Sequence, residues 1–305
     1  MTVTGPPSAA TAVRGDGRGP WQEVFDFGDY GELLALAQGS LVAGVLLGLV
    51  GGLAGVFVVV RDLPFAVHGI SELSFAGAAA ALLLGVNVVA GSIAGSLLAA
   101  VAIGVLGVRA RDRNSVIGIL LPFGLGLGVL FLSLHEGRAA NKFGLLTGQI
   151  IAVDTPQLAW LAGTSAVVLL ALAPMWRPLT FASVDPEVAE ARGVPVRTLS
   201  WAFMLVLGLA VALCVQVVGA LLVLSLLVTP AAAAARVTAS PGLLPLLSVV
   251  FALVAVEGGM LLSLGSSVPV SPYVTTLSFL IYLACRLYGT GRARRLAGAR
   301  PAGAD

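Results

Sequence analysis

The stretch LLALAQGSLVAGVLLGLVGGLAGVFVVV, residues 33–60, contains no Asp, Glu, Lys, Arg or His. A helix needs about 20 mostly apolar residues to cross the hydrocarbon of a bilayer, so this stretch can span one, with a tilt or a break. Comparable apolar stretches follow at about 63–86, 88–108, 115–134, 156–174, 199–217, 219–236, 243–264 and 271–288. The sequence therefore predicts an all-α, polytopic transmembrane helical bundle with about eight to ten spans.

The composition of the whole chain also indicates a membrane protein. Of its 305 residues, 58% are hydrophobic and only 10% are charged, and the mean hydropathy is +1.01. Soluble domains carry roughly 25% charged residues, so this chain could not cover a water-facing surface. The net charge of +2 is too small to suggest nucleic acid as a partner. We expect a multi-pass protein of the cytoplasmic membrane, surrounded by lipid.

Hydropathy divides the chain into three regions. Residues 1–32 are polar and end in an acidic cluster, which predicts a flexible N-terminal tail. Residues 33–288 form the predicted transmembrane domain, and residues 289–305 form a basic C-terminal tail. Arginines gather at 109–113, at 177–197 and in that tail, and loops rich in Arg and Lys remain in the cytoplasm. The C-terminus is therefore expected inside the cell.

Glycines recur at four-residue spacing inside the predicted spans, as in Gly44, Gly48 and Gly52 and in Gly91 and Gly95. Small residues one helical turn apart allow two helix backbones to approach closely in a membrane. We interpret these glycines as helix-packing positions.

Ionisable side chains are rare inside the predicted spans. Each costs about 3 kcal/mol on insertion scales, so each marks a candidate functional site. His68 and Glu72 lie in the second span, in FAVHGISELSFAG, and their i, i+4 spacing puts them on one face of a helix. An imidazole nitrogen and a carboxylate oxygen together suit a divalent ion such as Zn²⁺ or Mn²⁺. The pair predicts a metal contact, and a structural His–Glu hydrogen bond is the alternative.

Two further polar residues are weaker candidates. Glu257, in LVAVEGGMLLSL, could be a third ligand, a proton-linked group or a carboxyl that burial keeps neutral. Gln216 lies where two predicted spans meet and could line a transport path or join two helices by a hydrogen bond. No GxxxxGK[ST] phosphate loop and no HExxH motif occur. We therefore expect no catalytic residues, no permanently bound cofactor and no enzymatic activity of this chain alone.

One polar segment between spans, FASVDPEVAEARGVPV at 181–196, has the signals of a short helix. Asp185 can cap a helix that begins at Pro186, and Gly193 can end it. A short helix in a cytoplasmic loop suits docking to another subunit. An amphipathic helix lying on the membrane surface is the alternative.

Together these stretches resemble the permeases of zinc/manganese-class ATP-binding-cassette importers, from about Leu41 to Leu287. The resemblance is carried by VFVVVRDLPFAVHGISELSFAG, GLLTGQIIAV, the segment at 181–196, VVGALLVLSLLVTPAAAAARV at 217–237 and PVSP at 269–272. It implies a type II-like ABC importer permease that works as a homodimer or pseudo-dimer. An extracytoplasmic metal-binding protein would deliver the ion, and separate cytoplasmic ATPase subunits would bind and hydrolyse ATP.

The resemblance also implies site residues. Many relatives have an Asp and a His four residues apart in the second span, proposed to hold the metal, and these align with His68 and Glu72 in reversed order. Relatives often have an acidic residue near Ser267, which would line the pathway here. The ATPase would dock on residues of the 181–196 segment, namely Asp185, Pro186, Glu187, Ala191 and Gly193. Zinc is the favoured cargo and manganese the next.

Other functions remain compatible with the sequence alone. A secondary ion-coupled carrier could use His68, Glu72 and Glu257 as relay groups. An ABC permease for a metal chelate would need a wide cavity and gives no reason for a His–Glu pair. A membrane scaffold without transport would leave the intramembrane acidic groups unexplained.

Overall fold

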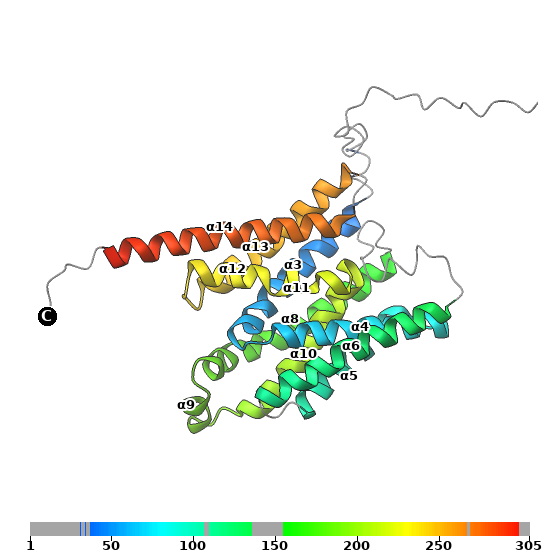
Figure 1. The fold of residues 1–305 in the computed structure, drawn as a ribbon, viewed down its shortest axis with the longest axis horizontal. Coiled ribbons are helices and arrows are strands. Elements are labelled where there is room, and N and C mark those ends of the chain that lie inside the picture. The colour runs from blue at the N-terminus through cyan, green and yellow to red at the C-terminus, as the bar shows by residue number, and fades with distance from the viewer. Residues whose placement is uncertain are drawn as a thin grey trace, which may run out of the picture.

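The computed structural model describes residues 31, 34, 37–106, 110–135, 155–266 and 269–298, apart from the side chains of 110–113, 155, 221 and 291–298. In these ranges every regular element is a helix, and eight helices are long and apolar enough to cross a membrane. They are α3 (Gln38–Val60), α4 (Pro64–Leu84), α5 (Val88–Leu106), α6 (Ala110–Leu134), α8 (Thr155–Val184), α10 (Val196–Val218), α13 (Leu243–Leu264) and α14 (Val270–Gly298). The predicted all-α transmembrane bundle is confirmed (Figure 1).

The predicted span at 219–236 is wrong as a single helix. The chain there forms a one-turn 3₁₀ helix, η2 (Ala220–Leu222), and two short helices, α11 (Val223–Leu227) and α12 (Thr229–Val237). Gly219 has φ 84° and ψ 158°, a conformation essentially restricted to glycine, and it separates α10 from η2. Pro230 lacks an amide hydrogen and cannot donate to the carbonyl four residues earlier in α11, so it begins a new helix, α12, rather than continuing α11.

The broken segment nevertheless returns the chain to the end of the bundle where α10 began. Figure 1 shows α12 running back beside α14, and α12 contacts both α13 and α14. Leu227 ends α11 inside the protein, where it is fully buried. Non-helical backbone at membrane depth is tolerated where protein surrounds it, and this segment satisfies that condition.

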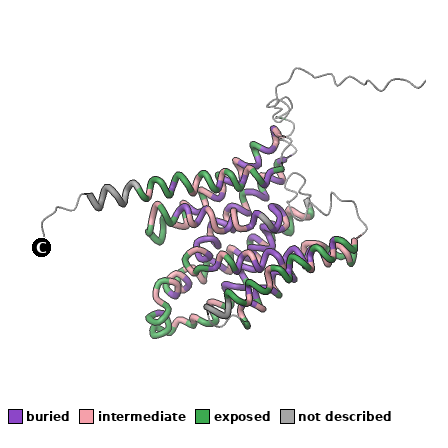
Figure 2. The backbone as a smooth tube through the Cα atoms, in the orientation of Figure 1, coloured by how far each residue is buried: buried purple, intermediate pink, exposed green. Residues whose placement is uncertain are grey.

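Three helices form the centre of the bundle. In the most apolar stretch of each helix, 72% of the residues of α10, 67% of those of α3 and 61% of those of α4 are buried. The corresponding share is 22% for both α6 and α8. Figure 2 shows the same contrast between a buried interior and exposed outer helices. The exposed outer residues include many large apolar side chains, such as Leu98, Ile119 and Leu170, as expected of a surface that faces lipid.

Glycines bring the helix backbones of α4 and α5 into contact. A Cβ added at Gly77 would overlap the carbonyl oxygen of Gly91, and one added at Gly95 would overlap the carbonyl oxygen of Leu73. A hydrogen bond between the hydroxyls of Ser74 and Ser92, 2.8 Å long, joins the same two helices. The predicted packing role of the small residues is confirmed on this pair of helices.

The glycine row of α3 packs against α13 in the same way. A Cβ at Gly52 would lie 2.6 Å from the Cα of Val249, and the hydroxyl of Ser248 donates a 2.7 Å hydrogen bond to the Gly52 carbonyl. Three residues further along α3, a Cβ at Gly55 would overlap the carbonyl oxygen of Leu227, at the end of α11. The small residues of α3 therefore hold both α13 and the broken segment.

The last helix extends beyond the predicted end of the membrane domain. α14 continues to Gly298, so the first part of the basic segment 289–305 prolongs the helix. No proline interrupts this stretch, and arginine is a good helix former. The cytoplasmic side of this segment stays a prediction, and nearly all of the predicted N-terminal tail lies outside the described residues.

Substitution Gly77→Ala should lower the free energy of unfolding by about 1–3 kcal/mol, because the new methyl group overlaps α5. Gly118 of α6 has no atom within 4 Å of an added Cβ, so it is the matched control. Gly118→Ala should be neutral or stabilising by up to about 1 kcal/mol, the intrinsic gain of Ala over Gly in a helix. The thermal unfolding midpoint of the purified chain in detergent measures both. Equal midpoints for the two variants would contradict backbone contact between α4 and α5.

Candidate metal path and docking helix

The first turns of α4 carry the His–Glu pair. α3 ends at Val60, and a tight turn through Asp62, with φ 53°, leads to Pro64, the first residue of α4. Proline suits that position because its amide would have no helical partner. His68 is half-buried and Glu72 is only 3% exposed. As expected from i, i+4 spacing in a continuous helix, both lie on one face of α4.

Neither side chain is fully satisfied by the protein. Among the described residues, Nδ1 of His68 and Oε2 of Glu72 are buried and have no hydrogen-bond partner. These two atoms therefore take no part in a hydrogen bond between the two side chains, the structural alternative. A buried carboxylate without a partner is costly, and a bound cation would remove that cost. The donor set, one imidazole and one carboxylate, therefore fits a divalent metal ion as cargo.

α6 packs directly on the backbone of α4 at Glu72. A Cβ added at Gly124 of α6 would lie 3.0 Å from the carbonyl carbon of Glu72 and 2.8 Å from a methyl carbon of Leu73. A Cβ at Gly128, one turn along, would overlap the ring of Phe75. The small residues of α6 thus let this helix lie directly on the turn of α4 that carries the carboxylate, and a larger residue there would displace it.

Glu257 and Gln216 occupy separate places in the fold. Glu257 is on α13 and faces α3, where a Cβ at Gly44 would lie 2.5 Å from its Oε1. Gln216 is in the last turn of α10, just before the break at Gly219. Oε1 of Glu257 and both polar side-chain atoms of Gln216 are buried without a hydrogen-bond partner in the described part of the chain. These atoms mark further buried polar positions, one on α13 and one on α10.

The described residues do not supply a three-ligand metal site. Among the residues that the structure describes, no group of three or more His, Cys, Asp and Glu side chains is placed to hold a metal ion. Glu257 is therefore not brought beside His68 and Glu72. Ser267, expected to line the pathway, lies outside the described residues. Cys214 and Cys285 are free, buried thiols.

The short helix predicted in the 181–196 segment is present, and its role in docking an ATPase stays a prediction. α9 spans Pro186–Ala191, and Oδ1 of Asp185 accepts a 3.0 Å hydrogen bond from the amide of Val188. Pro186 is the first helical residue, and Gly193 has φ 83°, the left-handed conformation that glycine adopts readily beyond a helix end. Pro186, Glu187, Ala191 and Gly193 are exposed, while Ala189 is buried. The helix thus presents an outer surface to the solvent.

Sequence reasoning missed the link between the α3–α4 corner and the start of α10. The Arg61 guanidinium donates a 2.5 Å hydrogen bond to Ser200 Oγ and lies 5.9 Å from the centre of the Phe203 ring. It also missed the break at 219–228, although Gly219 and Pro230 were the available signals. The apolar character of the stretch outweighed those two residues.

Comparisons with known proteins agree with this architecture. The family model of the ABC 3 transport family matches residues 34–289. The manganese transport system membrane protein MntC of Halalkalibacterium halodurans is 29% identical over 227 residues, which cover 74% of this chain and 78% of MntC. The high-affinity zinc uptake system membrane protein ZnuB of Haemophilus influenzae is 26% identical over 245 residues, which cover 80% of this chain and 94% of ZnuB.

A solved structure gives the same result for the fold. PsaBC from Streptococcus pneumoniae, in complex with Fab, superposes with a TM-score of 0.75 at 26% identity, covering 84% of this chain and 94% of that chain. The present chain accordingly has the fold of an ABC importer permease and is a multi-pass membrane protein. Because the family model spans nearly the whole transmembrane domain, the chain belongs to the ABC 3 transport family.

Proposed function

We propose that this chain is the membrane-spanning permease subunit of an ATP-driven importer for a divalent metal ion, Mn²⁺ or Zn²⁺. The observation that carries the proposal is the His68–Glu72 face of α4, where a buried nitrogen and a buried carboxylate oxygen have no protein partner in the described structure. Relatives named as manganese and zinc transport proteins support the choice of cargo.

Glu72 and His68 would each replace part of the ion's hydration shell during passage. Two ligands from one chain leave coordination positions open, because Zn²⁺ takes about four ligands and hard cations such as Mn²⁺ take about six. Water or the same pair from a second copy would fill these positions, so we propose a homodimer with the path between its subunits. A two-ligand, partly hydrated site also lets the ion leave, which a permease requires and a structural metal site avoids.

Energy would come from a separate ATPase. The exposed surface of α9, with Asp185 as its cap, is the proposed docking site on the cytoplasmic side. α9 contacts α8 and α10, so a force applied to α9 would reach two membrane helices directly. An extracytoplasmic metal-binding protein would deliver the ion at the other side. The chain itself would hold no ATP and no resident cofactor.

The ligand chemistry accommodates both candidate ions. Imidazole suits Zn²⁺, and carboxylate oxygen suits Mn²⁺. The preference for zinc derived from the sequence therefore stays a prediction. A secondary carrier is less well supported, because the capped docking helix and membership of an ABC family both favour an ATPase partner.

Replacing the His–Glu pair should abolish metal uptake. In cells that express the chain with its ATPase, we expect His68→Ala and Glu72→Gln each to reduce accumulation of labelled zinc or manganese at least about tenfold, the effect of about 1.4 kcal/mol. Glu257→Gln makes the same chemical change in a carboxyl on α13 and should retain most uptake. Comparing the two ions in the wild type identifies the cargo. Normal uptake by both α4 variants, at matched membrane levels, would exclude this face as the path.

Removing the cap of α9 should weaken ATPase binding. Asp185→Ala deletes the acceptor for the Val188 amide and should destabilise the helix by about 1 kcal/mol, whereas Asp185→Asn retains an acceptor oxygen. We expect less ATPase to co-purify with the alanine variant than with the asparagine variant or the wild type. If all three capture the same amount of ATPase under increasing salt, α9 is not the docking element.

A further inference from the structure

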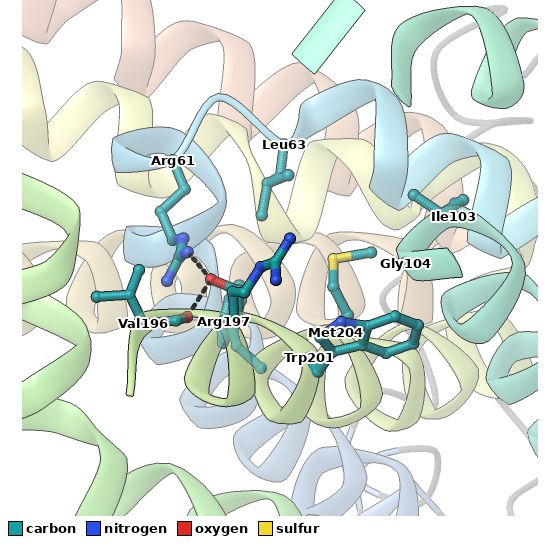
Figure 3. A pocket seen from close by; sticks show the side chains of 10 residues that line it. Arg61, Leu63, Ile103, Gly104, Val196, Arg197, Trp201 and Met204 are labelled. Carbon is teal, nitrogen blue, oxygen red and sulfur yellow. Dashed lines mark hydrogen bonds between the residues drawn. The ribbon is translucent and has the colours of Figure 1, made fainter. Parts of the chain in front are cut away.

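A pocket of about 380 Å³ opens where α3 ends and α10 begins. Its walls come from Arg61 at the end of α3, from the turn that follows, from α5 near Gly104, and from the first turns of α10. Figure 3 shows Arg61 reaching toward α10 and Arg197 extending from α10 into the same region. None of the described residues that line the pocket is Asp or Glu, so its charged lining is basic.

The two arginines are held differently. Arg61 donates to Ser200 Oγ and packs near the Phe203 ring, which fixes its guanidinium beside the first turns of α10. Ser200 in turn donates a 2.8 Å hydrogen bond to the Val196 carbonyl. Arg197 is exposed and can orient toward a ligand. Two guanidinium groups in one pocket repel each other, and an anion between them would offset that repulsion.

The distribution of arginines and an exposed tryptophan indicate that the pocket lies near the lipid headgroups. Its arginines belong to the end of the bundle that the distribution of Arg and Lys places in the cytoplasm. Trp201, 38% exposed, packs its ring on Gly104, where a Cβ would lie 2.8 Å from the ring carbon Cζ3. Tryptophan is enriched at the membrane–water interface. On the same two helices, Val101 of α5 and Leu205 of α10 are exposed apolar residues on the membrane side of the pocket that would contact acyl chains.

We propose that this pocket binds the phosphate group of an anionic phospholipid of the inner leaflet. A guanidinium presents paired N–H donors that match phosphate oxygens, so Arg197 and Arg61 would bind the phosphate from two sides. Free inorganic phosphate offers the same oxygens, but the apolar surface at Val101 and Leu205 favours a ligand with acyl chains. The lipid would thereby join the α3–α4 corner to the helix that follows the docking segment.

The test measures lipid retention rather than transport. The chain is purified with its ATPase in detergent, phosphatidylglycerol or phosphatidylcholine is added, and bound lipid is quantified by native mass spectrometry. We expect phosphatidylglycerol to be retained preferentially and Arg197→Gln to weaken its binding about fivefold, the effect of one arginine at an anionic headgroup. Arg197→Lys should keep most of the binding. Arg177→Gln, an exposed arginine at the end of α8 outside the pocket, is the charge-matched control.

Further measurements distinguish a lipid phosphate from free inorganic phosphate and from a contact with the ATPase. If inorganic phosphate competes for the pocket only at concentrations far above those of phosphatidylglycerol, the lipid assignment is supported. Equal retention of phosphatidylglycerol by the Arg197→Gln and Arg177→Gln variants would overturn it. Preferential binding of inorganic phosphate would also overturn it and assign a soluble anion. Loss of ATPase association in Arg197→Gln, with lipid retention unchanged, would identify the pocket as a protein contact and likewise overturn the proposal.

Discussion

Backbone N–H and C=O groups within the hydrocarbon of a bilayer must find their hydrogen-bond partners inside the protein. Long continuous helices meet this requirement, and eight of them form most of the described structure. The exception is the segment at 219–228, which is broken by Gly219 and lies among α3, α4 and α10. Val223 and Leu226, in the middle of this segment, are fully buried. In the described part of the chain, this interruption of the helix is therefore enclosed by protein.

Water is scarce inside a membrane-spanning bundle, so a buried polar atom without a hydrogen-bond partner marks a candidate functional position. The unpartnered atoms of His68, Glu72, Gln216 and Glu257 are distributed over α4, α10 and α13 rather than gathered in one cluster. A resident metal would need a complete set of ligands, whereas a transported ion can be held briefly by an incomplete set such as His68 and Glu72. Glycine at position 124 of α6 allows that helix to pack directly on the α4 backbone at Glu72. The proposed metal contact therefore lies beside a close helix contact that small residues make possible.

Few structural elements separate the proposed docking helix from the candidate metal ligands. α9 leads through Gly193 into α10, whose Ser200 is hydrogen-bonded to Arg61 at the end of α3. Only a short turn separates Arg61 from α4, which carries His68 and Glu72. A displacement of α9 therefore has a short route of covalent and hydrogen-bonded contacts to the candidate ligands. A lipid phosphate in the pocket beside Arg61 would act on the same junction.

Local sequence patterns were sufficient to predict the helical class, the eight long spans, the packing role of the glycines and the Asp185-capped helix. Each of these depends on residues within a few turns of one another, so hydropathy, spacing and capping preferences reveal them. The interruption at 219–228 was missed because its apolar composition matches that of a continuous span. Only the tertiary structure placed Glu257 against α3 instead of beside His68, brought α6 onto the α4 backbone at Glu72, and joined Arg61 to Ser200 across 139 positions. Such contacts depend on how distant helices pack, which no pattern within one segment encodes.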